Sequence, residues 1–221
     1  MLRRLGTIAY DLASRAILRV GPSAQIAGVR VSFFMWRGAA RDHAFKTIAQ
    51  ALDLIAAYAP RRFEAVRREF AAVLVYDCGP VLQLGQFNSR LRLCAVNAGY
   101  FDAQRAGIAD AVIAAGTLIH EAVHGRLARY GYTEDRLRDD RSLLHRVERL
   151  CVEAELDVIS LLPGSEATQA VYREILRAIP DMYSADAERA RNRAAIKEFL
   201  RLLGLSRRLS EAEGPTDRPA A

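Results

Sequence analysis

Residues 117–124 read Thr-Leu-Ile-His-Glu-Ala-Val-His, so the pattern H-E-x-x-H stands inside an apolar, helix-forming stretch. Side chains four positions apart lie on the same face of a helix, and the imidazoles of His120 and His124 can therefore hold one Zn²⁺ ion. Glu121 lies one position along the same turn, where its carboxylate can act on water beside such an ion. The stretch predicts a zinc site with Glu121 as its catalytic base.

The residues around this pattern predict a buried helix. From Ala111 to Ala128 the chain is apolar nearly all round a helix, and such helices lie in protein interiors. Buried polar side chains need partners. Histidine is also scarce in this chain, with 4 in 221 residues, which makes the paired histidines of this pattern specific. The alternatives are an exposed polar turn and a site that has lost its activity. The apolar residues around the motif favour metal binding instead.

A catalytic zinc needs a third protein ligand and an open position. The extended pattern H-E-x-x-H-x-x-G-x-x-H is not present, because Leu127 stands at the glycine position and Tyr130 at the last histidine position. The third ligand must therefore come from another segment. A helix expected over residues 140–162 carries the candidates His145, Glu148, Glu153 and Glu155.

Helical geometry separates these glutamates. Glu148 and Glu155 are seven positions apart and fall within about 20° of each other, on an otherwise apolar stripe. A carboxylate among apolar neighbours needs a cation or hydrogen bonds, which favours Glu148 as the third ligand. Glu155 is an alternative ligand or the partner that holds a histidine in place. Glu153 lies on a charged face, but its E-x-x-x-D pattern with Asp157 is that of thermolysin-like zinc sites, so it stays a third alternative.

Periodicity and turn residues predict an α+β fold that is mostly helical. Strand-like stretches are 29–36, 71–76, 81–85 and 91–96, with turn residues over 77–80 and 85–88. Helical stretches are 42–58, 61–70, 107–130, 140–162, 165–178 and 185–205. Three of the strands immediately precede the histidine helix. We therefore expect a small antiparallel sheet packed on that helix and on the glutamate-bearing helix that follows.

Charge and cysteine content narrow the class of protein. The net charge is +6 and comes from arginine, since Lys46 and Lys197 are the only lysines. No helix-turn-helix, zinc-finger or RNA-binding pattern accompanies this charge, so no specific nucleic-acid partner is expected. The three cysteines are Cys78, Cys94 and Cys151; their odd number and lack of a Cys-x-x-Cys pair favour a reducing, cytoplasmic location.

The N-terminal stretch has the spacing of a basic amphipathic helix over residues 2–19. Its apolar residues do not form a continuous run, because Asp11, Arg15 and Arg19 interrupt them. Neither a secretory signal nor a membrane span is therefore expected. Packing of this helix on its own domain is the favoured interpretation, with weak peripheral membrane contact as the alternative.

The histidine helix, the sheet before it and the glutamates after it together resemble a gluzincin, a zinc metallopeptidase with H-E-x-x-H and a downstream glutamate. Residues 70–163 carry the resemblance, which extends to minimal single-domain bacterial proteins of this type. It implies zinc at His120, His124 and a glutamate, with Glu121 as base. The domains expected for the whole chain are 1–40, an N-terminal amphipathic helix and strand packed on the domain, 41–205, a zincin-like metallopeptidase domain, and 206–221, a disordered tail whose composition has nothing to bury.

The resemblance implies hydrolysis of a peptide or protein substrate by metal-activated water. An oxyanion donor is then needed, and Tyr130, Tyr132 and Tyr183 are the candidates. Residues 91–96 or 97–100 could pair with an extended peptide by strand addition. The alternatives are a catalytically silent, zinc-stabilised binding or regulatory module, and a basic membrane- or nucleic-acid-binding protein in which the motif is incidental.

Overall fold

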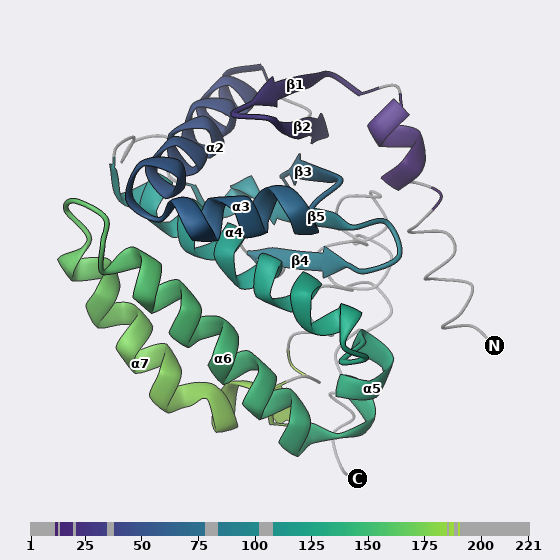
Figure 1. Cartoon of the computed structure of the whole chain (residues 1–221), viewed down its shortest axis with the longest axis vertical. Coiled ribbons are helices and arrows are strands. Elements are labelled where there is room, and N and C mark those ends of the chain that lie inside the picture. The colour runs from purple at the N-terminus through teal and green to yellow at the C-terminus, as the bar shows by residue number, and fades with distance from the viewer. Residues whose placement is uncertain are drawn as a thin grey trace, which may run out of the picture.

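A mixed β-sheet and the helices that cover it make up the described part of the chain (Figure 1). The computed structural model describes residues 12, 14–19, 21–34, 38–77, 84–101, 108–184, 186–187 and 190. The strands are β1 (Ser23–Ile26), β2 (Val29–Phe34), β3 (Ala72–Tyr76), β4 (Gly85–Asn88) and β5 (Leu93–Asn97). The helices are α2 (Gly38–Tyr58), α3 (Pro60–Glu69), the 3-10 helix η1 (Ala98–Tyr100), α4 (Ile108–Arg129), α5 (Glu134–Asp139), α6 (Arg141–Ile159) and α7 (Glu166–Met182). The α+β prediction is confirmed.

The predicted antiparallel sheet is wrong for its central strands. The strand order is β1-β2-β3-β5-β4, and β2, β3 and β5 run parallel, whereas β1 and β4 are antiparallel edge strands. Parallel neighbours need a crossover, which α2 and α3 supply between β2 and β3. The central strands β3 and β5 are buried along most of their length, as expected for parallel strands covered on both faces.

Both edge strands depart from the sequence prediction. β1 was not expected, and a tight turn joins it to β2 through Ala27 (φ 48°) and Gly28 (φ 79°), the positive angles typical of a two-residue hairpin. Residues 85–88 were expected to form a turn but are β4, paired with β5. The turn lies just after β4, where Asn88 Oδ1 accepts hydrogen bonds from the backbone amides of Arg90 and Leu91. The expected strand 81–85 lies outside the described residues except for its end.

The long helices follow the prediction closely, with differences at their ends and one short helix that was not expected. Pro60 opens α3 because its fixed φ and missing N–H suit the first turn of a helix. The glutamate-bearing helix α6 begins at Arg141, because the side chain of Asp140 caps it by accepting a hydrogen bond from Leu143 N. A short additional helix, α5, precedes it, and α7 extends to Met182, beyond the expected residue 178.

The histidine helix α4 is the centre of the fold. It contacts α2 and α3 on one side, β4 and β5 of the sheet on another, and α6 and α7 on a third (Figure 1). This position explains why its sequence is apolar nearly all round, with side chains such as Leu118 and Ile119 almost completely buried. A helix surrounded in this way can bring residues of distant segments together.

Several predictions concern parts of the chain outside the described residues. Residues 14–19 of the expected N-terminal helix are helical, but residues 1–11 are not described. The expected tail, 206–221, and most of the expected helix 185–205 also lie outside. The domain boundaries stay predictions. Among the described residues, no helix is long and apolar enough to cross a membrane.

Candidate metal centre

Two helices supply the residues predicted for the metal. His120 and His124 belong to α4, and Glu148 and Glu155 belong to α6. Helix α6 packs along α4 (Figure 1). The imidazoles are half-buried, with 16 % and 18 % of the side chain exposed, and both carboxylates are buried. The spacing of four residues on one helix and seven on the other brings all of them to the same interface.

The donor atoms converge on a common point. Nε2 of His120 and Nε2 of His124 are 3.1 Å apart. Glu148 Oε2 is 3.4 Å from the first nitrogen, and Glu148 Oε1 is 3.5 Å from the second. Two donors held 2.0–2.1 Å from a tetrahedral zinc ion lie about 3.3 Å from each other, so these separations fit an ion bound between the three side chains.

Glu155 and Tyr172 orient the first histidine. Nδ1 of His120 donates a hydrogen bond to Glu155 Oε1, which leaves Nε2 to face the convergence point. The hydroxyl of Tyr172, on α7, lies close to the same carboxylate, whose charge raises the pKa of this tyrosine further after burial. Gly116 makes room for this pair, because a Cβ there would lie 3.1 Å from the Tyr172 hydroxyl and 3.3 Å from Glu155 Oε2. Glu155 therefore stands behind the histidine, as a metal-ligating imidazole requires.

Tyr183 is the tyrosine that reaches this cluster. Its hydroxyl donates a 2.7 Å hydrogen bond to Glu148 Oε2, and its backbone oxygen accepts a 2.7 Å hydrogen bond from Arg141 at the start of α6. Tyr130 is 67 % exposed, and Tyr132 lies under the Arg136 guanidinium. Among the candidate tyrosines, Tyr183 alone has a hydrogen bond to a residue of the cluster in the described part of the chain.

The imidazoles and carboxylates of the cluster shift one another's pKa values. Burial alone lowers the pKa of His120, but the charge of Glu155 and hydrogen bonds to Glu148 and Glu155 raise this pKa well above its usual value. Burial likewise works to raise the pKa of Glu148, but hydrogen bonds and charge from His120 and His124 hold it well below the usual range. Burial raises the pKa of Glu121.

Negative charge is in excess within this interior. Glu121, Glu148 and Glu155 are all buried, and none of them pairs with an arginine or lysine of the described residues. The imidazoles of His120 and His124 are the basic groups beside these three carboxylates, and buried carboxylates that are only partly compensated are costly. A divalent cation at the convergence point would offset that cost, so both charge and geometry fit the predicted zinc.

Glu121 lies beneath the edge strand β4. A Cβ placed on Gly85 would be 2.6 Å from Glu121 Oε1 and 2.6 Å from Thr117 Cγ2, so only glycine allows the strand to approach so closely. β5, which the sequence offered as a peptide-binding strand, is paired on both sides with β3 and β4 and cannot accept another strand. The 3-10 helix η1 likewise replaces the strand considered over 97–100. Among the described strands, the sheet edge nearest Glu121 belongs to β4.

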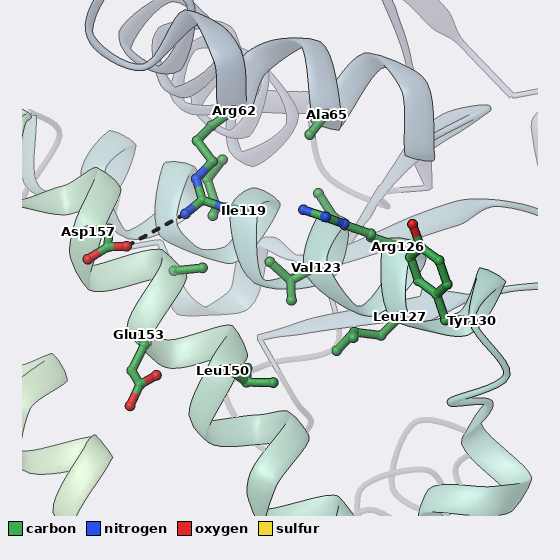
Figure 2. A pocket seen from close by; sticks show the side chains of 12 residues that line it. Arg62, Ala65, Ile119, Val123, Arg126, Leu127, Tyr130, Leu150, Glu153 and Asp157 are labelled. Atoms are coloured by element: carbon green, nitrogen blue, oxygen red, sulfur yellow. Dashed lines mark ion pairs between the residues drawn. The ribbon is translucent and has the colours of Figure 1, made fainter.

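The rival ligand Glu153 points elsewhere. It is exposed and lines a groove of about 390 Å³ between α3, α4 and α6, together with Asp157 (Figure 2). Asp157 pairs with Arg62 of α3 at 3.6 Å, not with a histidine. His145 is half-buried on α6 and has no partner in the cluster. Of the glutamates proposed from the sequence, the structure brings Glu148 and Glu155 to the histidines.

One residue of the cluster was not assigned from the sequence. The Sγ atom of Cys151 lies with the imidazole nitrogens of His120 and His124 in a group whose ligand atoms are all within 4.8 Å of one another. Burial, and then the charges of Glu148, Glu121 and Glu155, raise the pKa of its thiol. The signal was present in the sequence, because Cys151 follows Glu148 by three positions and shares its helix face.

No family model, no curated protein and no solved structure matches the chain. The gluzincin resemblance, the peptide substrate, the membrane contact through residues 2–19 and the cytoplasmic location therefore stay predictions. Any functional proposal depends on the chemistry of the site.

Proposed function

We propose that the protein is a zinc-dependent peptidase in which His120, His124 and Glu148 hold the ion and Glu121 is the general base and acid. One observation carries this proposal: two Nε2 atoms 3.1 Å apart and a carboxylate 3.4 and 3.5 Å from them converge in a buried, acidic interior. The Glu155 hydrogen bond that fixes the tautomer of His120 supports it further.

The residues of the site have distinct roles in the proposed hydrolysis. Zinc, when bound, polarises a carbonyl and lowers the pKa of water at the site. Glu121 accepts a proton from the attacking water at its carboxylate and passes it to the nitrogen of the leaving amine. Burial, which raises the pKa of this carboxyl, suits a group that must both take and release a proton. Tyr183, whose hydroxyl reaches the cluster through its hydrogen bond to Glu148, is our candidate for the oxyanion donor, and it would have to turn from Glu148 to the substrate.

The edge strand β4 supports an extended peptide as substrate. Its pairing with β5 uses one edge, and no other described strand pairs with it. A peptide added along the other edge would run past Gly85, whose position lies against the Glu121 carboxylate. Backbone hydrogen bonds would then align the substrate with little dependence on its side chains.

Metal analysis of the purified protein tests the metal assignment. Zinc near one equivalent per chain is expected in the wild type and in His145→Ala, whose histidine lies on α6 outside the cluster. The His124→Ala variant is expected to lose the metal, because it removes one of the converging nitrogens. Equal zinc contents in all three proteins, or no zinc in any, would overturn the assignment.

Cleavage of a peptide library tests the catalytic assignment. The Glu121→Gln variant is expected to keep its zinc and lose hydrolysis, since the amide cannot accept the proton. A wild type that binds zinc stoichiometrically but cleaves nothing would favour the alternative, a catalytically silent binding or regulatory module stabilised by zinc.

A further inference from the structure

We propose that Cys151 is a fourth protein ligand of the metal, which closes the centre in its resting form. The inference rests on the proposed function, because it concerns the same ion. His120, His124, Glu148 and Cys151 would then fill a tetrahedral shell, and hydrolysis would require the thiolate to leave.

The position of the thiol carries this inference. Cys151 lies one helical turn beyond Glu148 on α6, is completely buried, and is free of any disulfide. Its Sγ and the ring nitrogens of His120 and His124 all lie within 4.8 Å of one another. A sulfur 2.3 Å from a tetrahedral zinc and a nitrogen 2.0–2.1 Å from it are about 3.6 Å apart, so separations within 4.8 Å would have to shorten by about 1.2 Å at most.

A second buried cysteine shows that burial alone does not create this arrangement. Cys94 is equally buried and also free, but it lies on β5 and belongs to no group of potential ligands in the described part of the chain. A buried cysteine can act simply as a small apolar side chain, and Cys151 does pack near Leu143 and Val147. What distinguishes Cys151 is that its sulfur also faces two imidazoles.

Coordination by Cys151 has a defined chemical balance. The S–H bond breaks, a sulfur–metal bond forms, and the proton passes to water, with no change of oxidation state. A shell of four protein ligands is typical of closed zinc sites, whereas a catalytic site keeps one position open. The thiolate would also favour zinc over magnesium, calcium or manganese, which prefer oxygen ligands.

Cobalt substitution tests the sulfur ligand without a substrate. Wild-type protein loaded with one equivalent of Co²⁺ is expected to show a thiolate-to-cobalt charge-transfer band in the near ultraviolet. The matched control Cys94→Ala is expected to keep the band. Cys151→Ala and Cys151→Ser are expected to lose it while still binding cobalt through His120, His124 and Glu148, with circular dichroism to show that both variants fold.

X-ray absorption of the zinc-loaded wild type gives a second readout that needs no variant. One sulfur at about 2.3 Å from the zinc is expected. Stoichiometric metal with only nitrogen and oxygen neighbours, and a cobalt spectrum unchanged by Cys151→Ala, would overturn the sulfur ligand and leave the proposed peptidase standing. No binding of either metal by the wild type would overturn both proposals.

Discussion

Helix α6 carries two pairs of acidic residues whose surroundings are opposite. Glu148 and Glu155 are buried and hydrogen-bond or face the histidines of α4. Glu153 and Asp157 lie on another face of the same helix, at the groove of Figure 2, where both are exposed. The groups are chemically alike, but their positions along α6 place one pair on the buried face and the other on the exposed face.

The difference shows that burial decides which partners a carboxylate needs. An exposed carboxylate is stabilised by water, so the pair between Asp157 and Arg62 at 3.6 Å is worth little. A buried carboxylate must find a proton, a hydrogen-bond donor or a cation. Glu148 lies beside the imidazoles of His120 and His124 and accepts a hydrogen bond from Tyr183. Glu155 accepts a hydrogen bond from His120 and lies close to Tyr172. The buried pair therefore lies with the histidines of the proposed metal centre, and the exposed pair does not.

The sharpest test of this comparison is to neutralise one carboxylate on each face. Glu148→Gln is expected to weaken zinc binding by more than about 100-fold, beyond the range for residues that only orient a ligand. Glu153→Gln, the matched change on the exposed face, is expected to leave affinity unchanged. Competition with a chelator measures both. Equal affinities in the two variants would contradict the assignment of Glu148 as ligand.

A smaller effect is expected from the second buried carboxylate. Glu155→Gln removes the charge behind His120 but leaves the three converging side chains, so zinc affinity should fall by about 10- to 100-fold. Binding should still reach one zinc per chain at saturating metal. Complete loss of the metal in titrations followed by calorimetry would instead make Glu155 a ligand, the alternative raised by the sequence.

Loss of the Tyr183 hydroxyl is expected to weaken zinc binding less than the Glu155→Gln substitution does. Tyr183→Phe removes one hydrogen bond to the Glu148 carboxylate, and a hydrogen bond to a charged group is worth about 1.5 kcal/mol, or roughly tenfold in zinc affinity. If Tyr183 also donates to the oxyanion, kcat should fall by more than zinc affinity does. Tyr132→Phe is the control, since Tyr132 packs against apolar side chains such as Leu137 and Leu143 and has no hydrogen bond to Glu148 among the described residues. An unchanged affinity and kcat in Tyr183→Phe would remove both roles.

The smallest effect is expected on the exposed face. Asp157→Asn breaks the pair with Arg62, whose side chain is 40 % exposed while that of Asp157 is 73 % exposed. The free energy of unfolding should change by less than about 1 kcal/mol, as for other solvated pairs, and zinc affinity should not change. Urea denaturation measures this. A loss of several kcal/mol would show that the two faces of α6 differ less than their burial indicates.

Sequence patterns were sufficient for the helices and for part of the site. The four-residue spacing of His120 and His124 and the seven-residue spacing of Glu148 and Glu155 are set by helix geometry, so their shared faces followed directly. The strand β4 was mistaken for a turn, because Gly85 and Asn88 are turn residues by composition. Gly85 is instead required by the approach of β4 to Glu121, a contact across 36 positions of the chain that no local pattern contains.

The sequence by itself determined the donors that one helix can present together, because 3.6 residues per turn fix which side chains share a face. It therefore identified the histidine pair and the acidic stripe of Glu148 and Glu155, as well as a mostly helical α+β fold. Only the tertiary structure decided the parallel pairing of the central strands, the packing of α6 against the histidines of α4, and the hydrogen bond from Tyr183 to Glu148. Those outcomes depend on how separate helices and strands pack, and packing is set by contacts between segments far apart in the chain.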